Sequence, residues 1–164
     1  MNSIPPVLWT YIEGLKNHDV EGIGRTVSED LAFITPNKTL NRREFLQMLR
    51  AIYAGFPDWH YEHDAPELRQ TVIAVKWRQG GTHTGTLALP GSTPIPATGK
   101  TVRIPEHSFF YVVRGDAIAE IRPEPVPGGA PGGILEQIGV TRPFFDRNEA
   151  PVSEGLQTRG ENWA

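Results

Sequence analysis

Apolar residues near the start of the chain recur three or four positions apart, the spacing that places side chains on one face of a helix. The first run predicts a helix over residues 7–15, with Pro6 suited to its first turn and Ser3 a candidate cap. Asp19 is a suitable N-cap for a shorter second helix. The apolar side of that second helix would comprise Val20, Ile23 and Val27.

A third helical pattern follows Asn41. Asn41 and Glu44 have the spacing of a capping box, in which each residue bonds the backbone of the other. Behind them runs one apolar stripe, made of Phe45, Met48, Leu49, Ile52, Tyr53 and Phe56. The stretch therefore predicts an amphipathic helix whose apolar face lies on a core.

Beyond Gly55 the pattern changes from helical spacing to alternation. Large apolar residues alternate here with more polar or smaller ones, as in a sheet with one buried face; the apolar positions are Ile73, Val75 and Trp77. Strands are predicted over residues 31–36, 59–63, 71–88, 101–113 and 117–122, with a short helix over residues 134–138.

Two glycines, Gly80 and Gly81, leave the third of these strands open to two interpretations. They could form a two-residue hairpin turn, which would place His83 opposite Arg78. Alternatively, one long strand bends at the glycines and turns in the loop over residues 90–99. We favour the long strand, because that later loop has stronger turn chemistry.

Helices that come early and antiparallel strands that come later predict an α+β fold, with the helices covering one face of a curved sheet. A sheet curled around helices has an open mouth, which suits a small-molecule ligand. We expect one domain over residues 1–140. The largely polar remainder, residues 141–164, is expected to be an extended or partly disordered tail.

The amino-acid composition argues against nucleic-acid-binding and membrane-spanning proteins. The chain of 164 residues has no cysteine and a formal charge of −3, with its 16 Lys and Arg residues scattered, so nucleic acid is not an expected partner. No apolar run approaches the roughly 20 residues of a membrane span and no leader pattern opens the chain, so we expect a cytoplasmic protein.

Two features resemble a metal site and a cofactor site, but their residues do not have the spacing that such sites require. His60 and His63 lie three apart on a predicted strand and so point to opposite faces, which excludes a shared metal. The glycine-rich run over residues 128–133 lacks the spacing of a dinucleotide loop and lies in no βαβ unit. We therefore expect no metal and no cofactor.

His107 is the first candidate for acid–base chemistry. It shares one strand face with Phe109 and Tyr111, and it would be a base or an oxyanion donor if that face points inward. The opposite face of the strand is equally apolar, so a structural histidine is the alternative.

The other candidates are Glu120, Glu124, Arg122 and His83. Glu120 and Arg122 share a face and would form either a rim ion pair or a substrate clamp. Glu124 lies between two prolines that fix its backbone. His83 would enter the pocket if the long strand forms. The aromatic residues expected in the core or the pocket wall are Phe56, Trp59, Trp77, Phe109 and Tyr111.

Four segments, taken in order, resemble the SnoaL-like polyketide cyclase and ester cyclase family. They are GGTHTG at residues 80–85, PATGK at 96–100, GDAIAE at 115–120 and GILEQIG at 133–139. The resemblance implies the cone-shaped fold of nuclear transport factor. It also implies a homodimer, for which we expect contact through the outer sheet face near Arg78, Thr82 and Thr84.

The family also implies ring closure by an intramolecular aldol reaction without metal or cofactor, with an Asp as the acid–base group near the end of the last strand. That position falls at about Val126 here, and Glu124 is its nearest acidic substitute. We therefore expect a cofactor-free lyase or isomerase that acts on an apolar oxygenated substrate. The alternative is a non-catalytic protein of the same fold that binds a small molecule or serves as a dimerising accessory.

Overall fold

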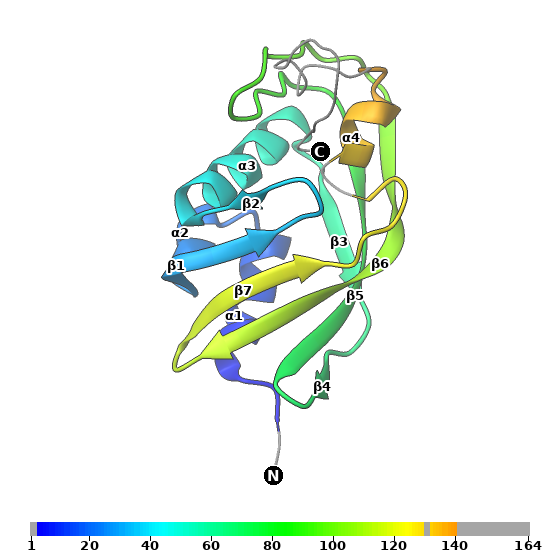
Figure 1. Ribbon diagram of the computed structural model, residues 1–164. Helices are drawn as coiled ribbons and strands as arrows, with labels where there is room; N and C mark the ends of the chain where they lie inside the picture. Colours follow the sequence, from blue (N-terminus) through cyan, green and yellow to red (C-terminus); the bar gives the residue numbers. More distant parts are fainter. Residues whose placement is uncertain (1–2, 130–131, 141–164) are drawn as a thin grey trace.

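The computed structural model describes residues 3–129 and 132–140, which build one mixed sheet and the helices packed on it (Figure 1). The helices are α1 Pro6–Lys16, α2 Val20–Gly24, α3 Arg42–Gly55 and α4 Gly132–Gln137. The strands are β1 Val27–Ile34, β2 Thr39–Leu40, β3 His60–His63, β4 Glu67–Arg69, β5 Val72–Thr82, β6 Thr101–Arg114 and β7 Ala117–Pro123. The tail expected over residues 141–164 lies outside the described residues.

The strand order is β2-β1-β7-β6-β5-β3, with β4 pairing to β5. Only the β1–β7 pair is parallel among these described pairings, and the others are antiparallel. Helices α1 and α3 lie on the same face of the curled sheet (Figure 1). The predicted α+β class, with helices covering one face of a curved sheet, is confirmed.

The helix starts follow the sequence signals closely. The Glu44 backbone N–H donates to the Asn41 side chain, and the Asn41 N–H donates to the Glu44 carboxylate, both at 2.9 Å. The Asp19 carboxylate accepts from the Gly22 N–H at 3.0 Å and caps α2. The capping expectation for Ser3 is wrong, because α1 begins after Pro5, which makes no side-chain cap.

Two strand boundaries differ from the prediction. Val27 is the first residue of β1 and not part of the second helix, because α2 ends at Gly24 and its last turn closes before the strand begins. The strand β5 ends at Thr82, so neither the hairpin at Gly80 nor the strand to residue 88 forms. Gly85 packs against the end of α3 instead, where its N–H donates to the Gly55 carbonyl at 3.0 Å.

A bulge in β6 brings Ile104 to the same face as His107. Trp77 pairs with His107, whereas Gln79 pairs with Ile104, so β6 carries one extra residue at this point. Pro105, which has no N–H to give to the ladder, lies in the bulge. As a result His107 and Ile104 are both buried although they are three residues apart.

The core fills the space between the inner sheet face and the helices. Its largest fully buried side chains include Trp77 and Tyr111 from the sheet, with Phe45 and Phe56 from α3 and its end. Tyr11 of α1 meets Tyr111 edge to face, with ring centroids 5.6 Å apart. The concave face of the sheet is therefore aromatic, and it is where a cavity forms.

Candidate functional site

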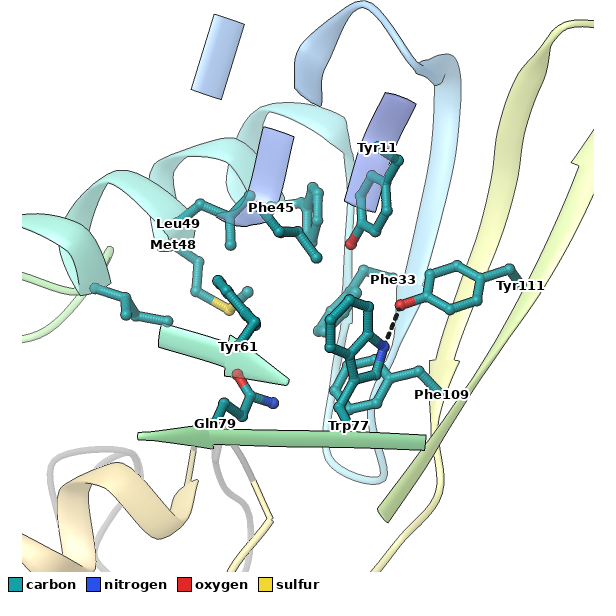
Figure 2. Close-up of a pocket in the computed structure, with 12 residues that line it drawn as sticks. Tyr11, Phe33, Phe45, Met48, Leu49, Tyr61, Trp77, Gln79, Phe109 and Tyr111 are labelled. Carbon is teal, nitrogen blue, oxygen red and sulfur yellow. Dashed lines mark hydrogen bonds between the residues drawn. The ribbon is translucent and has the colours of Figure 1, made fainter. Parts of the chain in front are cut away.

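A cavity lies between α1, α3 and the inner face of the sheet (Figure 2). Its lining residues are Tyr11, Leu15, Phe33, Phe45, Met48, Leu49, Ile52, Tyr61, Trp77, Gln79, Phe109 and Tyr111. The space open to the centre of a water molecule is about 50 Å³, enough for a few waters. Ligand pockets usually measure roughly 300–1,000 Å³, so a larger ligand requires the walls to move.

Tyr111 presents a hydrogen-bond donor to this cavity. The Trp77 indole Nε1–H, which can only donate, bonds the Tyr111 hydroxyl oxygen at 2.9 Å (Figure 2). The ring of Tyr11 packs edge to face on that of Tyr111, with centroids 5.6 Å apart. Because the Tyr111 oxygen accepts the bond from Trp77, the hydroxyl proton of Tyr111 remains available to a ligand.

Gln79 supplies a second donor. Its side-chain oxygen accepts from the Trp59 indole Nε1–H at 3.2 Å. Because that indole group can only donate, the bond fixes which end of the Gln79 amide is oxygen. The amide nitrogen consequently points away from Trp59, toward the side of the cavity where Trp77 lies (Figure 2).

The phenols of the cavity are neutral over the physiological range. Burial is the main reason that the pKa values of Tyr11, Tyr61 and Tyr111 all lie well above that of a free tyrosine. Among the described residues that line the cavity, none is Asp, Glu or His. The cavity itself therefore offers polarising donors to a ligand oxygen, while any base must come from its surroundings.

His107 is a neighbour of two residues that line the cavity but does not line it itself. Its cross-strand partner Trp77 and its ring neighbour Phe109, whose centroid is 5.1 Å away, both line the cavity. His107 Nδ1 lies 2.8 Å from the Pro105 carbonyl oxygen, so Nδ1 carries the proton and Nε2 holds a free lone pair when the ring is neutral. Within the described chain that Nε2 is buried without a hydrogen-bond partner.

His83 is buried away from the cavity, where it holds the loop that follows β5. Its Nδ1 accepts from the Thr98 N–H at 3.2 Å, and its backbone N–H donates to the Lys100 carbonyl at 2.9 Å. Its ring stacks on Phe56 at 5.1 Å. Burial lowers the pKa of His83 below that of a free histidine.

The lowered pKa of His83 makes stability pH-dependent with a defined sign. Below the unfolded-state pKa of about 6.5 the unfolded chain binds a proton that the folded chain takes up less readily, so stability falls as pH falls. We expect the free energy of unfolding to decrease from pH 6.5 downward, by at most about 1.4 kcal/mol per pH unit from this group. Urea unfolding at pH 7.5 and 5.5 measures it, and His83→Asn should flatten the decrease. An equal decrease in that variant would contradict the assignment.

The charged candidates occupy the outer face of the sheet. Glu120 pairs with Val112 and Arg122 with Phe110, opposite to the inward positions of Tyr111 and Ile121. The half-buried Glu120 and the exposed Arg122 form an ion pair at 3.5 Å. A second bulge, between Val112 and Val113, turns Ile118 inward, so Ile118 does not share the face of Glu120 and Arg122.

Glu124 is exposed at the end of β7. Its carboxylate accepts from the Ser108 N–H at 3.0 Å, and its own N–H donates to the Ser108 carbonyl at 2.8 Å. These bonds extend the β6–β7 ladder by one position. Glu124 therefore lies on the outside of the sheet, and the structure does not bring it to His107 or to the cavity.

Of the five aromatic candidates, Trp77, Phe109 and Tyr111 line the cavity and Phe56 and Trp59 do not. Trp59 reaches the site indirectly through its bond to Gln79. The residues that sequence reasoning missed as a site are mainly Tyr11, Tyr61 and Gln79. The signal that could have found the tyrosines is a hydroxyl on an otherwise apolar face, since a buried hydroxyl needs a partner.

The described residues gather no group of three or more His, Asp or Glu side chains close enough to hold a metal ion. No helix in the described ranges is long and apolar enough to cross a membrane. The outward residue Arg78 forms ion pairs with Glu106 at 2.8 Å and Asp64 at 3.1 Å, Thr82 is half-buried, and Thr84 is exposed.

Known proteins share this architecture. Residues 10–121 match the SnoaL-like domain, and the chain belongs to that family. No curated protein sequence matches it. AclR of Streptomyces galilaeus, a proposed hydroxylase, superposes with a TM-score of 0.63 at 16% identity over 81% of this chain and 78% of its own.

Two proposed polyketide cyclases are also similar in fold. The SnoaL-like protein of Jannaschia sp. CCS1 has a TM-score of 0.61 at 12% identity, covering 87% of this chain and 100% of its own. IdmH of Streptomyces antibioticus has a TM-score of 0.60 at 19% identity, covering 82% and 96%. At such identities the likeness establishes the fold, and the chemistry has to be argued from the site.

Proposed function

We propose that this protein binds an apolar, carbonyl-bearing small molecule in its aromatic cavity and acts on it as a cofactor-independent lyase or isomerase of the polyketide cyclase type. The observation that carries the proposal is the Tyr111 hydroxyl, whose oxygen accepts a hydrogen bond from Trp77 and whose own proton is therefore available to a ligand. A donor held in this way in a dry cavity suits an oxygen that gains negative charge during enolisation.

In the proposed step, His107 Nε2 takes the α-proton next to the carbonyl group. The electron pair of the broken C–H bond moves toward the carbonyl oxygen, which becomes an enolate oxygen and accepts the Tyr111 proton as a hydrogen bond. The enolate carbon then attacks a second carbonyl carbon of the same molecule, and His107 returns its proton to the new alkoxide. Atoms and charges balance without a cofactor.

This step requires the ligand to reach His107. Trp77 and Phe109, the neighbours of His107, line the cavity whereas His107 does not, and the free space is about 50 Å³. The ligand must therefore displace part of the wall as it enters. In this proposal the outer residues Glu120, Glu124 and Arg122 have no acid–base role, in contrast to the expectation from sequence, because their side chains are on the other face of the sheet.

The second candidate function is binding without chemistry. The observation that favours it is the lining of the described cavity, which contains donors but no group that titrates near neutral pH. A protein of this kind would store or carry a ligand with acceptor oxygens. The two candidates share the ligand class and differ only in whether the ligand changes.

A thermal-shift screen of aromatic polyketides and terpenoids tests the ligand class. A ligand at 100 times its dissociation constant is expected to stabilise the protein by about 2.7 kcal/mol, which raises the melting temperature measurably. Carbonyl-bearing members should stabilise and their deoxygenated analogues should not. Equal shifts from both would contradict the role given to Tyr111. Chromatography of the bound compound after incubation then separates turnover from binding.

Association and location are part of the same proposal. A homodimer would pair the outer faces of two sheets, where Arg78 and its acidic neighbours lie and where Phe110 and Val112 are half-buried. The cytoplasm remains the expected location. Light scattering at micromolar concentration tests the association, and a monomer there would contradict it.

A further inference from the structure

The cavity has one side that is less enclosed than the rest. Of its lining residues, all are buried except Tyr61 and Gln79, which are half-buried. These two residues are direct register partners, Tyr61 on β3 and Gln79 on β5. They lie next to each other at one side of the cavity (Figure 2), so the partly exposed lining is one continuous spot.

Each of these residues is held by one side-chain hydrogen bond to a residue outside the cavity wall. The hydroxyl groups of Tyr61 and Tyr53 are 2.7 Å apart. Gln79 is held by Trp59, as described above.

The residue that holds Tyr61 is itself fixed. The Tyr53 ring stacks on His18 with centroids 3.9 Å apart and planes 3° from parallel. His18 Nε2 lies 2.7 Å from the Trp59 carbonyl oxygen, to which it donates. The backbone of His18 has a φ of 56°, in the left-handed region that residues other than glycine rarely adopt. The end of α3, the turn after α1 and the loop before β3 thus meet behind Tyr61.

We infer that Tyr61 and Gln79 form the entrance to the cavity, and that the hydrogen bond between Tyr61 and Tyr53 is the latch that keeps it closed. The inference rests on three observations: the two half-buried residues of the described lining adjoin, a hydrogen bond reaches each of them from outside the wall, and the closed cavity is too small for the ligand class proposed. Rotation of Tyr61 away from Tyr53 would open a path past Trp77, whose ring meets Tyr61 edge to face at 5.6 Å.

Exchange of the Trp77 indole proton with solvent reports the open state without any ligand. That proton is hydrogen-bonded to Tyr111 inside the cavity and exchanges when water enters. Tyr53→Phe removes the latch from a residue that does not line the cavity. The loss of one net hydrogen bond should make exchange roughly fivefold faster by NMR. Tyr61→Phe breaks the same bond, so the double variant should be no faster than either single variant.

The matched control is Thr26→Val, which removes a buried hydrogen bond of 2.6 Å to the Ile23 carbonyl, away from the cavity lining. It should leave Trp77 exchange unchanged. An unchanged rate in Tyr53→Phe, or an equal acceleration in Thr26→Val, would overturn the latch. Because the readout uses no ligand, it can fail while the proposed function holds, and the ligand screen can fail while the latch holds.

Discussion

His107→Asn is expected to lower turnover by roughly 10²-fold or more, the usual effect of losing a general acid–base group. The asparagine amide can still donate to the Pro105 carbonyl, as His107 Nδ1 does at 2.8 Å, but it has no basic nitrogen in place of Nε2. Folding and ligand affinity should therefore change little. The measurement is the initial rate with a compound that the screen shows to be converted.

His107→Ala is the less informative variant, because it also leaves the Pro105 carbonyl without its partner and opens space beside Phe109. Glu124→Gln serves as a surface control, since Glu124 lies on the outer face. This variant should fold and keep full activity. If Glu124→Gln lost turnover and His107→Asn retained it, the base would lie in the family's usual region and our assignment would be wrong.

Tyr111→Phe is expected to reduce turnover by roughly 10²–10³-fold, the typical loss when one oxyanion donor is removed. The ligand should also bind more weakly, because its carbonyl oxygen loses its partner. The variant leaves the Trp77 indole N–H buried without an acceptor, which should cost about 1–3 kcal/mol of stability. Rates, affinities and urea unfolding curves of the folded variant measure the three effects.

Thr26→Val provides the stability control for that experiment, because it removes a buried hydrogen bond away from the cavity. Its turnover and affinity should equal those of the wild type. Were Tyr111→Phe to retain full affinity and turnover, the carbonyl group would bind elsewhere. Gln79, the second donor of the cavity, would then be the next residue to vary.

The helices and most strands could be predicted from the sequence, because helix caps and apolar periodicity depend on residues only a few positions apart. The capping box of Asn41 and Glu44 and the apolar stripe behind it are such signals. The end of β5 could not be predicted in this way, since it depends on the contact of Gly85 with Gly55, a residue at the end of α3. The short strand β4 was missed for a similar reason, as its three residues are ordered by pairing with β5.

The candidate site was predicted in part. The inward face shared by His107, Phe109 and Tyr111 could be expected from alternation, and the bulge at Pro105 adds Ile104 to it. Alternation alone could not exclude the opposite face, which is equally apolar. The placement of Glu120 required the register of β7 on β6, and the donor role of Tyr111 required its contact with Trp77. These are long-range contacts that no local pattern contains.

The most direct test of the account is a crystal structure with a carbonyl-bearing ligand from the screen. The account predicts the ligand in the cavity between α1, α3 and the sheet, with a carbonyl oxygen about 2.5–3.0 Å from the Tyr111 hydroxyl. It also predicts that Trp77 and Phe109 move to enlarge the present space of about 50 Å³. A ligand bound on the outer sheet face, or in the cavity with its oxygen directed away from Tyr111, would contradict the central claim.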